Sequence, residues 1–197
     1  AIMAPNIPEM YEAHFGVPMT GAVLNCLNTR LDAAMIAFIL DHSEVKVLIV
    51  DREFHRVATE ALAIAKVQPL VVDIDDPQFR EGVPIGDTTY EEFIAAGDPG
   101  CAWQYPADEW NAISLNYTSG TTGNPKGVVY SHRAAILMAL QFMAFVHMGS
   151  RNGGPEVLMP MAPMFHGNAW QFPYLAPMAG TPQVSVTRSP SSSSYSL

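Results

Sequence analysis

The chain has 197 residues, of which 49% are hydrophobic and 15% are charged, a composition that excludes a largely disordered protein. Its formal net charge of −9 disfavours nonspecific binding to nucleic acid. All but one of the 19 carboxylates lie before residue 110, whereas four of the ten Lys and Arg lie after it. The second half of the chain can therefore accept an anionic ligand more readily than the first.

The sequence predicts no export signal, membrane span or cysteine-based site. Residues Ala1 to Asn6 lack the charged and apolar regions of a signal peptide and resemble the end of a strand. The longest apolar run, 134–148, is interrupted by two polar residues and is shorter than the roughly 20 residues that a span requires. Because Cys26 and Cys101 lie far apart without metal-ligand spacing, we expect a reducing, cytoplasmic compartment.

The first half of the chain alternates between helical and strand patterns. Apolar residues at helical spacing over 31–39 predict a helix entered from Asn28 or Thr29, and the apolar run 45–50 predicts a buried strand. A second helix is expected over 53–66 and a second strand over 70–74. This alternation predicts an α/β fold with a doubly wound, mostly parallel sheet layered with helices.

The second half begins with a long connection and then returns to regular structure. Residues 75–111 are rich in Asp, Gly and Pro and predict surface connection, relieved by a short helix near 90–96. Strands are expected over 112–117 and 128–130. A mostly apolar helix over 132–148 follows a serine that can cap it.

The loop between those two strands, Tyr117 to Gly127, combines four Ser and Thr hydroxyls, three glycines and Lys126. Glycines let backbone N–H groups turn toward a ligand, and hydroxyls add donors around a tetrahedral anion. These features are typical of a polyphosphate cradle.

Two other interpretations of this loop fit less well. A Gly/Ser/Thr-rich linker is disfavoured because strands flank the loop closely and it carries a single lysine. The P-loop of NTPases requires glycine before the lysine and Ser or Thr after it, but Pro125 and Gly127 stand there, and a strand follows in place of a helix.

The segment Tyr117 to Gly127 resembles the signature phosphate loop of the adenylate-forming (AMP-binding) superfamily, which includes acyl-CoA synthetases, peptide-synthetase adenylation domains and luciferases. Ala4-Pro5-Asn6 and the stretches 21–31, 90–110 and 163–170 also resemble fatty-acyl-CoA synthetases. The last of these is more similar to fatty-acid enzymes and the plant acyl-activating group than to luciferases.

The resemblance implies a ligase that uses ATP, Mg²⁺ and CoA. A carboxylate attacks the α-phosphate of ATP, pyrophosphate leaves, and the thiol of CoA then displaces AMP. The implied phosphate-binding residues are Thr118, Ser119, Gly120, Thr121, Thr122, Gly123 and Lys126. Ser119 matches a hydroxyl position that can reach the magnesium ion in relatives, with Thr121 and Thr122 as alternatives.

The second motif lies at residues 165–170. The resemblance implies that His166 lies near the reacting carboxylate as a catalytic residue, and that His166, Asn168, Ala169 and Trp170 bind substrate, with Trp170 similar to an aromatic gate. Taken from the residues alone, His166 and Trp170 are equally compatible with core packing. The other five histidines, His14 among them, are expected to be surface or packing residues.

Residues 1–180 are expected to form part of the AMP-binding domain, and 181–197 a Ser-rich, disordered tail. Because the later motifs of the family do not occur, we expect an N-terminal fragment that does not complete adenylation alone. Its expected partners are a fatty or other carboxylic acid, ATP and CoA, with homo-oligomerisation through exposed apolar surface as a possibility. The alternative is a noncatalytic nucleotide-binding or assembly module, or a structural remnant.

Overall fold

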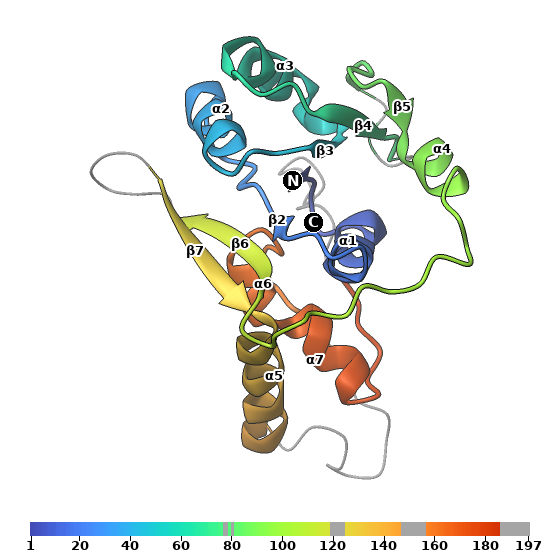
Figure 1. Ribbon diagram of the computed structural model, residues 1–197, viewed down its shortest axis with the longest axis vertical. Helices are drawn as coiled ribbons and strands as arrows, with labels where there is room; N and C mark the ends of the chain where they lie inside the picture. The colour runs from blue at the N-terminus through green and yellow to red at the C-terminus, as the bar shows by residue number, and fades with distance from the viewer. Residues whose placement is uncertain (77–78, 80, 119–124, 147–156, 186–197) are drawn as a thin grey trace, which may run out of the picture.

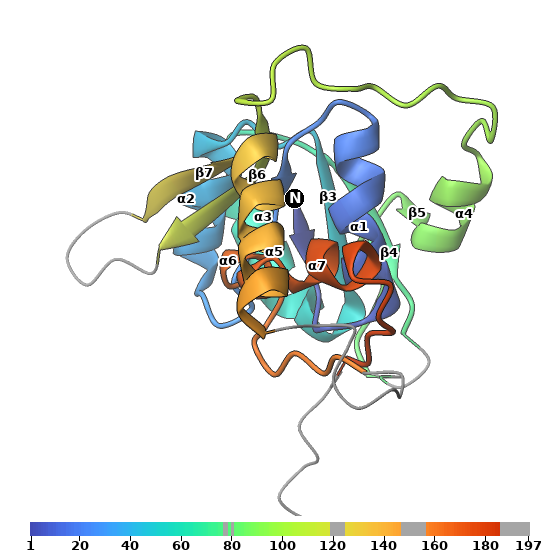
Figure 2. The same ribbon diagram turned by 90° about the horizontal axis from the view of Figure 1, so that it is seen from below.

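The strands of the protein form two sheets, as the computed structural model of residues 1–76, 79, 81–118, 125–146 and 157–185 shows (Figures 1 and 2). The first sheet is parallel throughout and has the order β1 (Ile2–Met3), β3 (Val47–Asp51), β4 (Leu70–Ile74), β5 (Thr88–Thr89). The second has the order β2 (Leu24–Asn25), β6 (Ala112–Thr118), β7 (Lys126–Ser131). In it β2 and β6 are parallel, whereas β6 and β7 form an antiparallel hairpin.

Helices cover both faces of the first sheet (Figure 1). Alternate residues along a strand point to opposite faces, so Ile49 packs with α1 (Pro8–Met19) and α4 (Tyr90–Ala95). Its neighbours Leu48 and Val50 pack on the other face. That face is covered by α2 (Ala33–His42), the 3₁₀ turn η1 (Arg52–Phe54) and α3 (His55–Ile64). The doubly wound α/β fold expected from the sequence is confirmed.

The first helices differ from the sequence-based expectation at their starts. Helix α2 begins after Asp32, because the Asp32 carboxylate accepts a hydrogen bond from the Met35 N–H at 2.8 Å; the start at Asn28 or Thr29 was wrong. Helix α1 was not expected at all. It contains Gly16 and Pro18 and has little apolar periodicity, but it begins with a proline in its first turn and is held by tertiary packing.

The described residues after β7 form three helices. Helix α5 (His132–Val146) begins as expected with Ser131, whose hydroxyl accepts a hydrogen bond from the Ala134 N–H at 3.1 Å. After α6 (Gly167–Trp170), helix α7 (Phe172–Met178) lies beside α5 in both views of Figures 1 and 2. In the described part of the chain, each helix is too short or too polar to cross a membrane.

The end of the described chain is paired with an earlier segment. The Leu158 N–H donates to the Pro182 carbonyl, and the Val184 N–H donates to the Leu158 carbonyl, both at 2.8 Å. The rest of the expected disordered tail, 186–197, lies outside the described residues, so that expectation stays a prediction.

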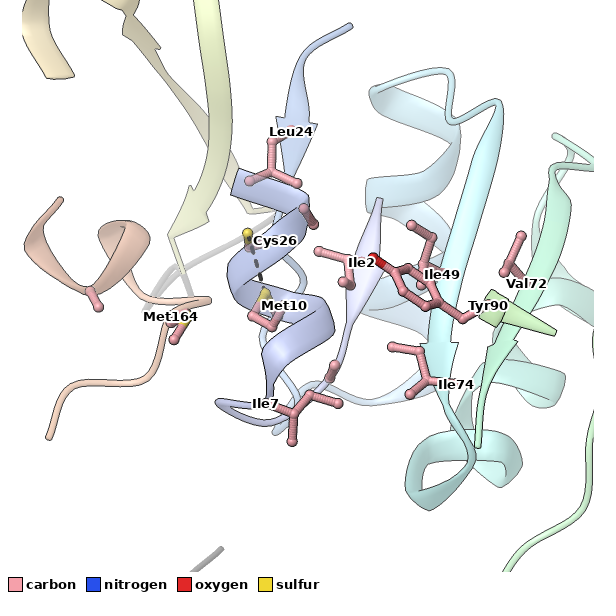
Figure 3. Packing of buried hydrophobic residues seen from close by; sticks show 13 residues of the cluster. Ile2, Ile7, Met10, Leu24, Cys26, Ile49, Val72, Ile74, Tyr90 and Met164 are labelled. Atoms are coloured by element: carbon pink, nitrogen blue, oxygen red, sulfur yellow. Dashed lines mark hydrogen bonds between the residues drawn. The ribbon is translucent and has the colours of Figure 1, made fainter. Parts of the chain in front are cut away.

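The core between the sheets joins residues from distant parts of the chain. Figure 3 shows Met10 of α1 and Cys26 close together, with Met164 from the segment before α6 in the same cluster. Within this region His14 of α1 is fully buried. Its Nδ1 lies 2.7 Å from the Met10 carbonyl oxygen; because a carbonyl only accepts, Nδ1 carries the proton and donates. Burial lowers the pKa of His14 to about 4.

The burial of His14 makes stability depend on pH. In the unfolded chain the imidazole takes up a proton near pH 6.5, but in the folded protein only near pH 4, so the unfolded state holds more protons between these values. Above pH 6.5 we expect His14 to have no effect on the pH dependence of the free energy of unfolding. As the pH falls from 6.5 to 4, the titration of this group should lower the free energy of unfolding by about 3 kcal/mol.

Urea unfolding of the wild type and of His14→Gln over this pH range measures the effect, since the difference between the two proteins cancels other titrating groups. Tyr174, whose ring lies edge-on to His14 at 5.9 Å, stays neutral because burial raises its pKa. A difference that does not change with pH would contradict the expectation.

Candidate functional site

A cleft of about 440 Å³ lies between the β6–β7 hairpin, the start of α5 and the turn that contains α6. Its walls are formed largely by Thr118, Val128, Tyr130, Met138, His166 and Trp170. The cleft therefore unites the two segments singled out by the sequence, which are separated by about forty residues along the chain.

The hairpin carries the predicted phosphate loop at its open end. Thr118, the last residue of β6, is paired with Lys126, the first residue of β7, and both are exposed. The expected ligands between them, Ser119, Gly120, Thr121, Thr122 and Gly123, lie outside the described residues. Gly127 packs closely against β6, since a Cβ there would lie 3.0 Å from the Leu115 Cδ1, which would have to shift.

The turn at α6 has an unusual backbone. Five successive residues, Gly167 to Gln171, have φ between 46° and 67°, the left-handed region. For each residue other than glycine this conformation costs about 1 to 2 kcal/mol, and less for asparagine, so the turn needs compensating interactions. Such strain is found mainly where the surrounding structure fixes it, often at functional sites.

The turn places its side chains on two sides. His166 and Trp170 are exposed and line the cleft, and Trp170 keeps 54% of its surface accessible, which argues against the core-packing alternative for it. Asn168 and Ala169 are fully buried beneath the turn. The structure thus brings His166 and Trp170 together with Thr118, whereas Asn168 and Ala169 are not among the residues that line the cleft.

A buried polar network holds Asn168. Its side-chain Oδ1 accepts hydrogen bonds from Asn116 Nδ2 at 2.7 Å and from the Ser114 hydroxyl at 3.0 Å, both on β6. Its Nδ2 donates to His14 Nε2 at 3.1 Å. The Cys26 Sγ lies 4.0 Å from the same Nδ2. None of these partners of Asn168 was expected from the sequence, from which His14 was expected to be a surface or packing residue. No signal in the sequence marked His14, because the helix α1 that carries it was itself not expected.

Asn6 holds the segment just before the turn. Its Oδ1 accepts a hydrogen bond from the Met164 N–H at 2.7 Å, and its Nδ2 donates to the Ala162 carbonyl at 3.1 Å. This clamp gives a physical role to the Ala4-Pro5-Asn6 motif, because it ties the start of the chain to the entrance of the α6 turn.

The described lining of the cleft would not repel a ligand with negative charge. Among the described residues that line it, none is Asp or Glu. Asn116 Oδ1 and Gln171 Oε1 are buried at the cleft, and neither accepts a hydrogen bond from the described part of the chain. Both oxygens are shielded from solvent, so a ligand donor would reach them only if neighbouring side chains moved. No group of three His, Cys, Asp or Glu residues that could hold a metal occurs within the described ranges.

A second hollow of about 660 Å³ lies elsewhere, against α1, β2, α4 and the start of β3. It is lined mainly by apolar side chains, including Val17, Val23, Val47 and Phe93. It contains none of the residues that the sequence analysis assigned to a site.

Comparison with known proteins identifies relatives of this chain. The family model for AMP-binding enzymes matches residues 1–195. The chain is 47% identical to the peroxisomal acetate/butyrate–CoA ligase AAE7 of Arabidopsis thaliana, over 92% of this chain and 33% of that protein. It is 46% identical to the acetate–CoA ligase CCL3 of Humulus lupulus, over 92% of this chain and 34% of that protein.

The fold has a matching solved structure. The anthranilate CoA ligase AuaEII in complex with anthranoyl-AMP superposes with a TM-score of 0.78 at 24% identity, over 96% of this chain and 35% of that chain. The chain thus spans about a third of the length of the curated relatives it matches. The resemblance noted in the loop and turn motifs is confirmed: the chain belongs to the family of AMP-binding enzymes.

Proposed function

We propose that this chain carries the phosphate-binding hairpin and part of the acyl pocket of an AMP-forming acid–CoA ligase. The observation that carries the proposal is the cleft in which Thr118 of the hairpin lies together with His166 and Trp170 of the left-handed turn. Because the chain spans about a third of its relatives, the activity belongs to the full set of family elements, and the 197 residues alone are proposed to bind ligands without completing adenylation.

In the proposed reaction an oxygen of the carboxylate bonds to the α-phosphorus of ATP while the bond to pyrophosphate breaks, and the CoA sulfur later takes the acyl group as AMP leaves. Thr118, Lys126 and the loop between them would hold the departing phosphates, so that their charge is stabilised as it grows. His166, at the cleft, would orient the carboxylate. Mg²⁺ would neutralise phosphate charge, with Ser119 proposed as its hydroxyl ligand.

The proposed acid is a small monocarboxylate such as acetate or butyrate. The two relatives at 46% and 47% identity are named for these acids. Trp170 supports the same choice, because its large ring lies at the cleft, where it would limit acyl length. A cytoplasmic location, inferred from the unpaired Cys26 and Cys101, stays a prediction, and the AAE7 relative is peroxisomal.

The alternative function is a noncatalytic nucleotide-binding module. This alternative is supported by the length of the chain, which covers only about a third of each relative. Pyrophosphate exchange that depends on added carboxylate separates the two when the remaining family elements are supplied in trans. Part of a ligase would then support exchange, whereas a noncatalytic module would bind ATP without exchanging it.

Replacing Lys126 should weaken binding of Mg·ATP. The exposed ammonium group lies at the open end of the hairpin, where it can pair with the β- and γ-phosphates. We expect Lys126→Ala to raise the Kd for Mg·ATP roughly tenfold in calorimetric titration of the 197-residue chain, the usual effect of losing one charge-assisted contact.

Lys66→Ala is the matched control. Lys66 is also exposed, but it lies in the connection between α3 and β4, a strand of the first sheet. It should leave the Kd unchanged. Equal effects of the two substitutions would show that only net charge matters and would contradict a phosphate site at the hairpin.

Replacing Trp170 should change the preference for acyl length. Butyryl and dodecanoyl sulfamoyl-adenosines are stable mimics of the acyl-adenylate, and we expect the wild type to bind the butyryl compound more tightly. In Trp170→Ala the loss of the ring should reduce this preference roughly tenfold. Trp103→Ala, which removes another exposed tryptophan at a distance from the cleft lining, should not; a parallel change in both variants would argue against an acyl role for Trp170.

A further inference from the structure

We infer that His14 is a positioning residue for the cleft: through Asn168 it fixes the left-handed turn that presents His166 and Trp170. The functional part of this inference rests on the proposed function, since it assumes that the cleft takes an acyl-adenylate. The structural part rests on the contacts alone.

The hydrogen bonds around His14 have one consistent direction. The Met10 carbonyl can only accept, so Nδ1–H of His14 donates to it at 2.7 Å and Nε2 is left as an acceptor in the neutral ring. The amide Nδ2 of Asn168 lies within hydrogen-bond distance of that nitrogen, at 3.1 Å. Asn168 must therefore turn its NH₂ toward His14.

This orientation sets the other end of the amide. With NH₂ toward α1, the Asn168 carbonyl oxygen faces β6, where two donors meet it: Asn116 Nδ2 at 2.7 Å and the Ser114 hydroxyl at 3.0 Å. A flipped amide would place the Asn168 carbonyl oxygen against the acceptor Nε2 of His14, and its NH₂ against the NH₂ of Asn116. All four side chains are at least nine-tenths buried, so water cannot replace a lost partner.

The turn depends on such fixation because its own backbone is unfavourable. Ala169 and Trp170 adopt positive φ without the freedom of glycine. Asn168 lies within the turn, two positions from His166 and two from Trp170. Its amide is hydrogen-bonded to α1 on one side and to β6 on the other. These bonds fix the positions of His166 and Trp170 relative to both elements.

A simple packing role for His14 would give a different result, and two substitutions separate the possibilities. Gln and Met have similar size and shape, but only Gln offers an oxygen that can accept from Asn168 at the place of Nε2. If His14 merely fills space, His14→Met should be tolerated at least as well as His14→Gln, since Met is the more apolar residue in a buried site.

The experiment follows Trp170 directly. In a Trp103→Phe, Trp110→Phe background Trp170 is the sole tryptophan of the chain's three. Time-resolved fluorescence anisotropy then reports motion of the turn without any ligand. We expect His14→Gln to match its parent and His14→Met to gain a fast local component, while both proteins unfold cooperatively in urea.

A second measurement tests the functional part. The Kd of the butyryl sulfamoyl-adenosine should rise roughly tenfold in His14→Met and stay within a factor of about three of wild type in His14→Gln. If wild type does not bind the compound, the proposed function fails, and the anisotropy alone decides the positioning role. Equal anisotropy and equal affinity in the two variants would overturn the inference.

Ser114→Ala keeps the test decisive if His14→Met does not fold. It removes one of the two donors to Asn168 Oδ1 and leaves Asn116 and His14 in place. We expect the same fast component of Trp170 at smaller amplitude. Unchanged Trp170 motion in Ser114→Ala would contradict control of the turn by this network.

Discussion

The buried amide of Asn168 is the contact on which the site depends. It lies where α1, β6 and the α6 turn meet, and each of its polar atoms is satisfied by a residue from one of the other two elements. An unpaired amide in this core would cost a few kcal/mol, so the three elements are coupled in a way that apolar packing alone would not impose. The strained backbone from Gly167 to Gln171 is thereby held in one conformation, with His166 and Trp170 at the cleft.

The two sheets have different roles in the structure. The parallel sheet is covered on both faces and contributes to the two larger apolar clusters of the core. Helix α1 packs against one of these faces. The smaller sheet contributes the hairpin, whose open end carries Thr118 and Lys126. Asn6 and His14 connect these parts, because both lie near the start of the chain and both bond to the segment 162–168. A rigid frame thus positions a loop and a turn that are distant in sequence.

Much of this frame could be predicted from the sequence, because period and composition are local signals. The strand 70–74 and the hairpin strands around the Gly-rich loop follow from apolar runs and turn residues. Helix α1 could not be predicted, since Gly16 and Pro18 weaken its local pattern and tertiary packing supplies its stability. The role of His14 was equally hidden, because its partner Asn168 lies 154 residues away.

The site itself was predicted in outline and completed only by the fold. The two motifs indicated a phosphate loop and an acyl pocket, but not that His166 and Trp170 face the cleft while Asn168 and Ala169 lie beneath the turn. Alternation in a strand would have placed His166, Asn168 and Trp170 on one face, whereas the left-handed turn buries Asn168 and exposes the other two.

A crystal structure of the 197-residue chain with butyryl sulfamoyl-adenosine tests the central claim most directly. We expect the compound between the hairpin and the α6 turn, with its acyl end near Trp170. A compound bound instead in the apolar hollow against α1 and α4, or absent from the cleft at saturating concentration, would contradict the assignment of this cleft as the acyl-adenylate site.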